Sequence, residues 1–239
     1  MPPAVVAAVT VLLAVPGAVA TAAAAPATSS TPANAAVTPL DKYLDNLRTL
    51  RATFLQTLAD PHGREIDRAS GTLIVQRPGK FSWDIRPQPV SAGAAGASTT
   101  AAPAGGAGQL MVCDGTNLWF YDRDLQQVTV KPVDAALSAT PAMLLSGAVD
   151  VRKSFTLAPV GEREGLEWVL VEPAGAQADF RSALFGFEHG ELRRLILEDK
   201  LDQTATIVFE KIERNAPVRP AEVSFTPPPG ADVIGAPHK

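Results

Sequence analysis

An alternation of apolar and polar residues over 73–85 constrains the fold more than any other feature of this sequence. Most of the even-numbered positions in this segment are polar, with Ile74 as the exception. Side chains that alternate with a period of two lie on opposite faces of a β-strand. Pro78-Gly79 predicts a turn or a bend, so the segment is a strand pair or one kinked strand. The side chains expected on the shared face are Leu73, Val75, Arg77, Phe81, Trp83 and Ile85.

Short segments of the same kind recur along the rest of the chain and predict further strands. They are joined by turn-forming pairs such as Asp114-Gly115, His189-Gly190 and Asp199-Lys200. Together they predict a mainly β fold, a meandering antiparallel sheet of roughly ten strands that curls on itself. The additional strands are expected at 110–113, 117–121, 127–131, 155–157, 167–171, 183–187, 192–198 and 204–212, and the pattern closes at 223–225.

Two segments predict helices. Over residues 40–58, leucines and Phe54 recur at spacings of three and four, which predicts an amphipathic helix with a charged outer face. A second helix is expected over 140–146, where Pro141 suits the first turn and Gly147 ends it.

The start of the chain predicts export. Residues 5–19 are apolar and uncharged and end in Ala18-Val19-Ala20, which is typical of a secretory signal peptide. The first three residues contain no Lys or Arg, and the alternative is a signal anchor that stays in the membrane. Pro16 and Gly17 interrupt the apolar run, which is shorter than the ~20 residues that a bilayer span needs. We therefore expect a signal peptide over 1–25.

The mature chain is expected to hold one domain over residues 39–239. A disordered leader of mostly Pro, Ala, Ser and Thr precedes it over 26–38. Residues 91–108 contain only Ser, Ala, Gly, Thr and Pro, so this stretch has no large side chain to bury. It predicts an expanded surface loop inserted between two neighbouring strands.

Composition excludes several function classes. The 21 Lys and Arg against 25 Asp and Glu give a net charge of −4, which disfavours a role that depends on phosphate neutralisation. The one cysteine, Cys113, excludes an intramolecular disulfide and a Cys-based zinc site. We expect it to be a small buried hydrophobic residue.

No catalytic motif is present, so neither an enzyme nor a cofactor is predicted. The three histidines, at positions 62, 189 and 238, have no metal-ligand spacing and no neighbouring nucleophile signature. Asp114, Asp122 and Asp124 flank one expected strand. They are either a calcium site or ordinary turn residues, and turn chemistry is the simpler interpretation.

Arg77 is the one charge on the apolar face of the first strand pair. Burying it is costly unless it is paired or hydrogen-bonded. Either a kink at Pro78 moves it to the rim, or it meets acceptors inside, such as the carbonyls at a helix end. In the second case, the helix at 140–146 is a candidate lid over a ligand cavity.

Several stretches match a known family in order and spacing. They are Arg77-Pro78-Gly79-Lys80-Phe81-Ser82-Trp83, the segment Asp-Gly-Thr-Asn-Leu-Trp-Phe-Tyr-Asp at 114–122, Gln-Val-Thr at 127–129, the helix at 140–145 and Phe-Thr-Pro-Pro-Pro-Gly-Ala-Asp-Val at 225–233. Together they resemble the LolA family of outer-membrane lipoprotein carriers over residues 40–234. The main departure is the insertion at 91–108, which lengthens a loop without touching a motif.

The resemblance implies an incomplete antiparallel β-barrel of about ten to eleven strands with a helical lid over a hydrophobic cavity. It implies a periplasmic monomer that shelters the acyl chains of triacylated lipoproteins. An ATP-driven transporter in the inner membrane releases this cargo, and an acceptor in the outer membrane receives it. The acceptor normally carries a lipidated N-terminal cysteine, which is missing here.

The resemblance also assigns roles to residues. The latch arginine of the family falls on Arg77, which bonds the lid in the empty form, and its motif aromatics fall on Phe81 and Trp83. The expected acyl-chain lining comprises Leu47, Phe54, Leu73, Val75, Phe81, Trp83, Met143, Leu144 and Leu145.

Two other function classes remain open. One is a periplasmic protein of the same fold that binds a different lipid or senses envelope stress. The other is a structural protein whose apolar face is only a core. Co-purified lipid distinguishes the first from a lipoprotein carrier, and uptake of a fluorescent fatty acid distinguishes the second.

Overall fold

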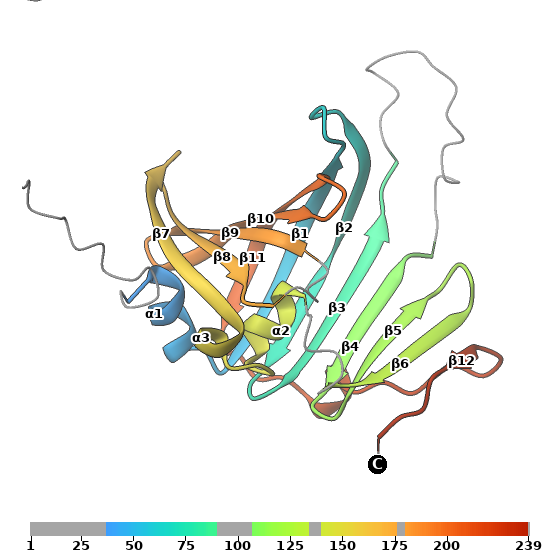
Figure 1. The fold of residues 1–239 in the computed structure, drawn as a ribbon. Coiled ribbons are helices and arrows are strands. Elements are labelled where there is room, and N and C mark those ends of the chain that lie inside the picture. Colours follow the sequence, from blue (N-terminus) through green and yellow to red (C-terminus); the bar gives the residue numbers. More distant parts are fainter. Residues whose placement is uncertain (1–36, 90–106, 134–139, 176–179, 239) are drawn as a thin grey trace, which may run out of the picture. The chain divides into compact units, whose positions relative to one another are not determined.

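A computed structural model describes residues 37–89, 107–133, 140–175 and 180–238. Strands dominate these residues (Figure 1). The strands are β1 (Thr49–Ala59), β2 (Glu65–Gln76), β3 (Lys80–Pro87), β4 (Gln109–Asp114), β5 (Asn117–Asp122), β6 (Gln127–Pro132), β7 (Phe155–Arg163), β8 (Leu166–Pro173), β9 (Phe180–Glu188), β10 (Glu191–Asp199), β11 (Thr204–Arg214) and β12 (Asp232–Ile234). The helices are α1 (Pro39–Asp45), α2 (Pro141–Ser146), α3 (Val151–Ser154) and the short 3₁₀ helix η2 (Pro220–Glu222).

The strands form a twelve-stranded sheet in the order β12-β6-β5-β4-β3-β2-β1-β11-β10-β9-β8-β7. Neighbouring strands are antiparallel, except that β12 pairs in parallel with β6. β1 pairs with both β2 and β11 and so joins the two halves of the sheet. The sheet is open and curled, with β12 and β7 as its edges, and α1, α2 and α3 lie within its curl (Figure 1). This confirms the mainly β fold with an incomplete barrel.

The ten strands expected between 71 and 212 are confirmed, and the pairing of β2 with β3 follows the predicted alternation. Leu73 lies opposite Trp83 and Val75 opposite Phe81, and all four side chains are buried on the same side. Arg77 departs from this pattern because it lies beyond the end of β2, in the turn that contains Pro78 and Gly79.

The helix predicted over 40–58 is wrong beyond its first turns. α1 ends at Asp45 and β1 begins at Thr49. In β1, every second residue is buried, at Leu50, Ala52 and Phe54. The same residues therefore fit the period of a strand, although the spacing of the leucines also fits a helix. Hydrogen bonding to a strand on each side decides between the two, because it satisfies the backbone groups of β1 through tertiary pairing.

The twelfth strand had no signal in the sequence. β12 is exposed, and it exists because the chain returns to pair Asp232–Ile234 with residues 127–129 of β6. Residues 223–225 form no strand. Phe225 instead packs against Trp119 and Tyr121 of β5, with ring centroids 5.6 and 5.9 Å apart.

Other expectations fall partly outside the described residues. The signal peptide predicted for 1–25 lies there, as do most of the leader and residues 91–106 of the inserted loop. The last leader residue, Thr38, is the buried N-cap of α1. At the other end of the loop, Gly108 is buried, and a β-carbon there would lie 2.2 Å from the carbonyl oxygen of Ile85. No helix in the part that the structure describes is both long and apolar enough to span a bilayer.

Candidate functional site

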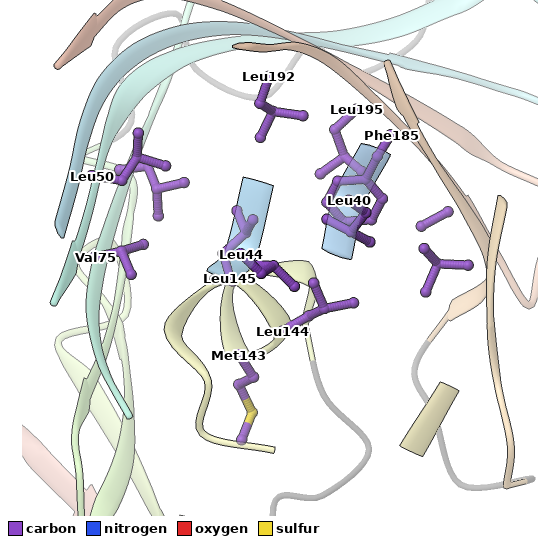
Figure 2. Packing of buried hydrophobic residues seen from close by; sticks show 14 of the residues in the cluster. Leu40, Leu44, Leu50, Val75, Met143, Leu144, Leu145, Phe185, Leu192 and Leu195 are labelled. Carbon is purple, nitrogen blue, oxygen red and sulfur yellow. The ribbon is translucent and has the colours of Figure 1, made fainter. Parts of the chain in front are cut away.

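The residues expected to line a lipid cavity all belong to one buried cluster on the inner side of the curled sheet. Each of the nine side chains is at most 6% exposed. Figure 2 shows this cluster with residues from α1, α2, β1, β2, β9 and β10. The nine residues are Leu47, Phe54, Leu73, Val75, Phe81, Trp83, Met143, Leu144 and Leu145.

Helix α2 is the most apolar part of this cluster. All six of its residues are buried, although a helix this short has little stability of its own. Its formation therefore depends on the apolar surface that the sheet and α1 provide. The side chains of Met143, Leu144 and Leu145 pack on the inner side of the sheet (Figure 2).

The end of α2 is tied to the turn between β2 and β3. The backbone N–H of Gly79 donates to the carbonyl of Ser146 over 2.8 Å. Gly147 ends the helix in the left-handed conformation with φ of 70°, which glycine adopts without steric cost. The N–H groups of Gly147 and Ala148 donate back to Leu144 and Met143.

Arg77 contacts the C-terminal ends of two helices. Its Nη1 donates to the carbonyl of Leu44 in α1 over 2.6 Å, where a cation also favours the helix dipole. Its guanidinium lies against Gly147, since a β-carbon at Gly147 would be 2.9 Å from Nε and Nη2. Burial lowers the pKa of Arg77, and the charge of Asp45 opposes this shift. The half-buried arginine thus meets a helix-end carbonyl, but that carbonyl belongs to α1.

A second arginine ties α1 to α3. Arg152 donates from Nε to Oδ1 of Asp41 over 3.0 Å and from Nη2 to Oδ2 over 2.5 Å. Asp41 also closes the capping box with Thr38 at the start of α1. Burial raises the pKa of Asp41, but the hydrogen bonds from Thr38 and Arg152 outweigh it and hold that pKa below its usual value.

A groove of about 450 Å³ runs beside these contacts. It follows the boundary between α1 and the segment that links α2 to α3, and Arg77 is part of its wall. The other lining residues are Asp41, Leu44, Asp45, Gly147, Val149, Asp150, Val151 and Arg152.

Sequence reasoning missed three of the residues that hold the helices. Asp41 could have been found from the Thr38-x-x-Asp41 pattern, which resembles a capping box. The sequence indicates Gly147 only as a helix end, and its close approach to Arg77 depends on tertiary packing. Arg152 carries no local signal, because its partner lies 111 positions away.

Two of the aspartates considered for calcium act as turn residues, and the third, Asp124, accepts from the N–H groups of Ala107 and Gly108. Asp114 accepts hydrogen bonds from the N–H groups of Thr116 and Asn117 and from Nε1 of Trp119. Asp122 accepts from the N–H groups of residues 124 and 125. Across the described ranges, no group of three or more metal-ligating side chains is close enough to hold an ion. Cys113 is buried, and its Sγ donates to the carbonyl of Gly79 over 3.0 Å.

Comparison with known proteins agrees with this architecture. The family model of the outer membrane lipoprotein carrier protein LolA matches residues 45–91 and 102–226, so the match breaks within the inserted loop. An outer-membrane lipoprotein carrier protein from Dechloromonas aromatica is 41% identical over 84% of this chain and 88% of its own length. A second, from Nitrosospira multiformis, is 38% identical over 82% of this chain and 86% of its own length.

Among solved structures, an uncharacterized conserved protein from Thermus thermophilus aligns with a TM-score of 0.46 at 14% identity, over 82% of this chain and 96% of that chain. The match of the family model and the identity to these curated relatives each extend over most of the chain. The chain belongs to the LolA family of outer-membrane lipoprotein carrier proteins.

Proposed function

We propose that this protein is a periplasmic carrier that holds the acyl chains of lipoproteins on the inner side of its curled sheet. The observation that carries the proposal is the buried cluster in which α2 occupies an apolar interior built by the sheet and α1. All six residues of this helix are buried, and a helix this short has little stability of its own, so acyl chains can take its place at low cost. Family membership supports lipoprotein as the cargo.

The free energy of exposing acyl chains explains why such a carrier is needed. Three acyl chains contain on the order of 40 methylene groups, and each is worth ~0.8 kcal/mol when it leaves water. Full exposure would cost roughly 30 kcal/mol, so free diffusion through an aqueous compartment is negligible. The carrier has to cover most of this apolar surface and still release it.

Competition between α2 and the acyl chains provides a release mechanism. In the closed state, α2 covers the apolar wall and is held by Gly79 at its end and by Arg77 between its C-cap and α1. Cargo binds when α2 moves away, which breaks the Gly79–Ser146 hydrogen bond and the packing of Arg77 on Gly147; the bond to Leu44 is lost as well when α1 moves with α2. Their return favours expulsion of the acyl chains, so Arg77 is a latch that weakens cargo binding.

The transport route follows from the same proposal. Removal of the signal peptide over 1–25 leaves a monomeric carrier in the periplasm. An ATP-driven transporter in the inner membrane loads it with triacylated lipoprotein, and an acceptor in the outer membrane receives the cargo. The carrier performs no covalent chemistry on the lipoprotein.

Mass spectrometry of the protein purified from its native periplasm tests this function. We expect part of the purified protein to carry triacylated lipoprotein, with one lipoprotein per carrier in that part. Co-purification of a glycolipid or a regulatory protein in their place would favour the lipid-binding or sensor alternative. A protein that takes up neither lipoprotein nor a fluorescent fatty acid would indicate that the cluster is only a core.

A further inference from the structure

Trp83 carries a buried hydrogen-bond donor that the fold leaves without a partner. Its indole Nε1 is one of three buried side-chain N or O atoms that lack an acceptor or donor within the described residues, the others being Tyr43 Oη and Thr140 Oγ1. Trp83 is 6% exposed and belongs to the inner cluster. In the unfolded chain this N–H donates to water. Burying it without an acceptor loses that hydrogen bond and destabilises the fold, so such a group calls for an explanation.

The other two tryptophans make this donor unusual. Trp119 donates from Nε1 to Asp114 Oδ2 over 2.7 Å, and Trp168 donates to the carbonyl of Arg163 over 3.0 Å. Both are also buried. The fold thus satisfies the indole N–H of both tryptophans that lie outside the inner cluster and leaves the one in the cluster unsatisfied.

The residues directly opposite Trp83 on both neighbouring strands are apolar. Trp83 lies opposite Leu73 of β2 and Met111 of β4. Its ring packs edge-to-face against Phe54, with centroids 5.8 Å apart and an interplanar angle of 86°. Nε1 thus has no acceptor among the described residues and lies beside apolar side chains, so a ligand that brings an acceptor into the inner cluster would satisfy it.

We propose that Nε1 of Trp83 donates a hydrogen bond to a carbonyl oxygen of the bound acyl chains and so selects acyl over alkyl chains. The inference rests on the proposed carrier function. Every acyl chain begins with a carbonyl group, which is a hydrogen-bond acceptor attached directly to the apolar tail. Phe54, Leu73 and the other apolar wall residues hold the tail, and Trp83 recognises its polar head.

Two synthetic lipopeptides test this assignment. They share the peptide, the capped amine and the chain length, and the two glyceryl chains are palmitoyl esters in one and hexadecyl ethers in the other. We expect the wild-type protein to bind the ester about tenfold more tightly, which equals about 1.4 kcal/mol. Trp83→Phe keeps an aromatic ring but removes the donor, so the ester-to-ether ratio is expected to fall to about one. Trp119→Phe is the matched control and is expected to keep the wild-type ratio.

Indole N–H resonances of the wild-type protein labelled with ¹⁵N-tryptophan provide a test that needs no variant. We expect the Trp83 proton to move downfield when the ester binds and less when the ether binds, while those of Trp119 and Trp168 stay in place. An unchanged Trp83 resonance, or a Trp83→Phe ratio equal to that of the wild type, would overturn the assignment. Failure of the wild-type protein to bind either lipopeptide would instead contradict the carrier function.

Discussion

Replacing Arg77 by leucine isolates the latch contacts from the apolar wall. The change removes the hydrogen bond to the carbonyl of Leu44 and the guanidinium that packs on Gly147. Leucine cannot donate to the helix end, so α1 and α2 lose their shared contact. The apolar wall itself is unchanged, because the side chain of Arg77 does not belong to the inner cluster.

The structure sets the size of the effect. A hydrogen bond from a charged donor contributes about 1.5–3 kcal/mol. The guanidinium is half-buried, so desolvation offsets part of that gain, and we take the lower end of the range, about 1.5–2 kcal/mol. Because this bond joins Arg77 to α1, the full effect applies when α1 and α2 leave the turn together, and the closed state is then weakened roughly 10- to 30-fold relative to the open one.

Loading and transfer should change in opposite directions by the same factor. Tighter cargo binding follows because the competing closed state is weaker. The equilibrium constant for transfer to the acceptor is a ratio of two affinities, so it should fall as much as the loading affinity rises. Titration with a triacylated lipopeptide measures the first quantity, and equilibrium partitioning between carrier and acceptor measures the second. Arg77→Lys should be intermediate, because an ammonium lacks the planar fork of the guanidinium.

Arg123→Leu is the matched control. Arg123 donates to both oxygens of Asp84 over 2.8 and 3.0 Å, away from α1 and α2. We expect its loss to lower thermal stability and to leave loading and transfer unchanged. Weaker loading by Arg77→Leu, or a transfer constant equal to that of the wild type, would refute the latch.

Gly147→Ala should also tighten lipopeptide binding, because its β-carbon would lie 2.9 Å from the Arg77 guanidinium; an affinity equal to that of the wild type would contradict this contact. Deletion of residues 91–106 should preserve loading and transfer, and a folded protein that loads but does not transfer would show that the loop docks to the acceptor. Cys113→Ser should keep transport intact in the same assays, since a hydroxyl can donate to the same carbonyl, and loss of transport with normal folding would overturn this. Asp41→Asn should lower the free energy of unfolding in urea by about 1–2 kcal/mol at pH 7. The folded pKa of Asp41 lies below its unfolded value of 3.8. The difference in unfolding free energy between wild type and variant should therefore be complete above about pH 4 and vanish as the pH falls through the folded pKa. A stability difference that persists in acid would refute this.

Much of the candidate site could be predicted from local sequence. The alternation over 73–85 predicted which side chains of β2 and β3 are buried together. The Pro141 start and the Gly147 end predicted α2 to within a residue. These signals are reliable because side-chain periodicity and capping act over a few neighbouring residues.

The partner of Arg77 could not be predicted in this way. The sequence indicated a charge that needs a hydrogen-bond acceptor, and the helix at 140–146 was one candidate source. The bonded carbonyl is that of Leu44, 33 positions earlier. The choice depends on how α1 and α2 pack inside the sheet, which no local pattern encodes.

The segment after α1 separates the two kinds of information most clearly. By itself, the sequence determined that this segment has one apolar face and that the apolar side chains over 73–85 share a face, while leaving open a strand pair or one kinked strand. Only the tertiary structure decided that residues 49–59 form a strand, that β12 joins β6, and that the indole of Trp83 lacks an acceptor. The physical reason is that strand pairing and buried hydrogen bonds join residues far apart in the chain, so their free energy exists only once the sheet has closed around its helices.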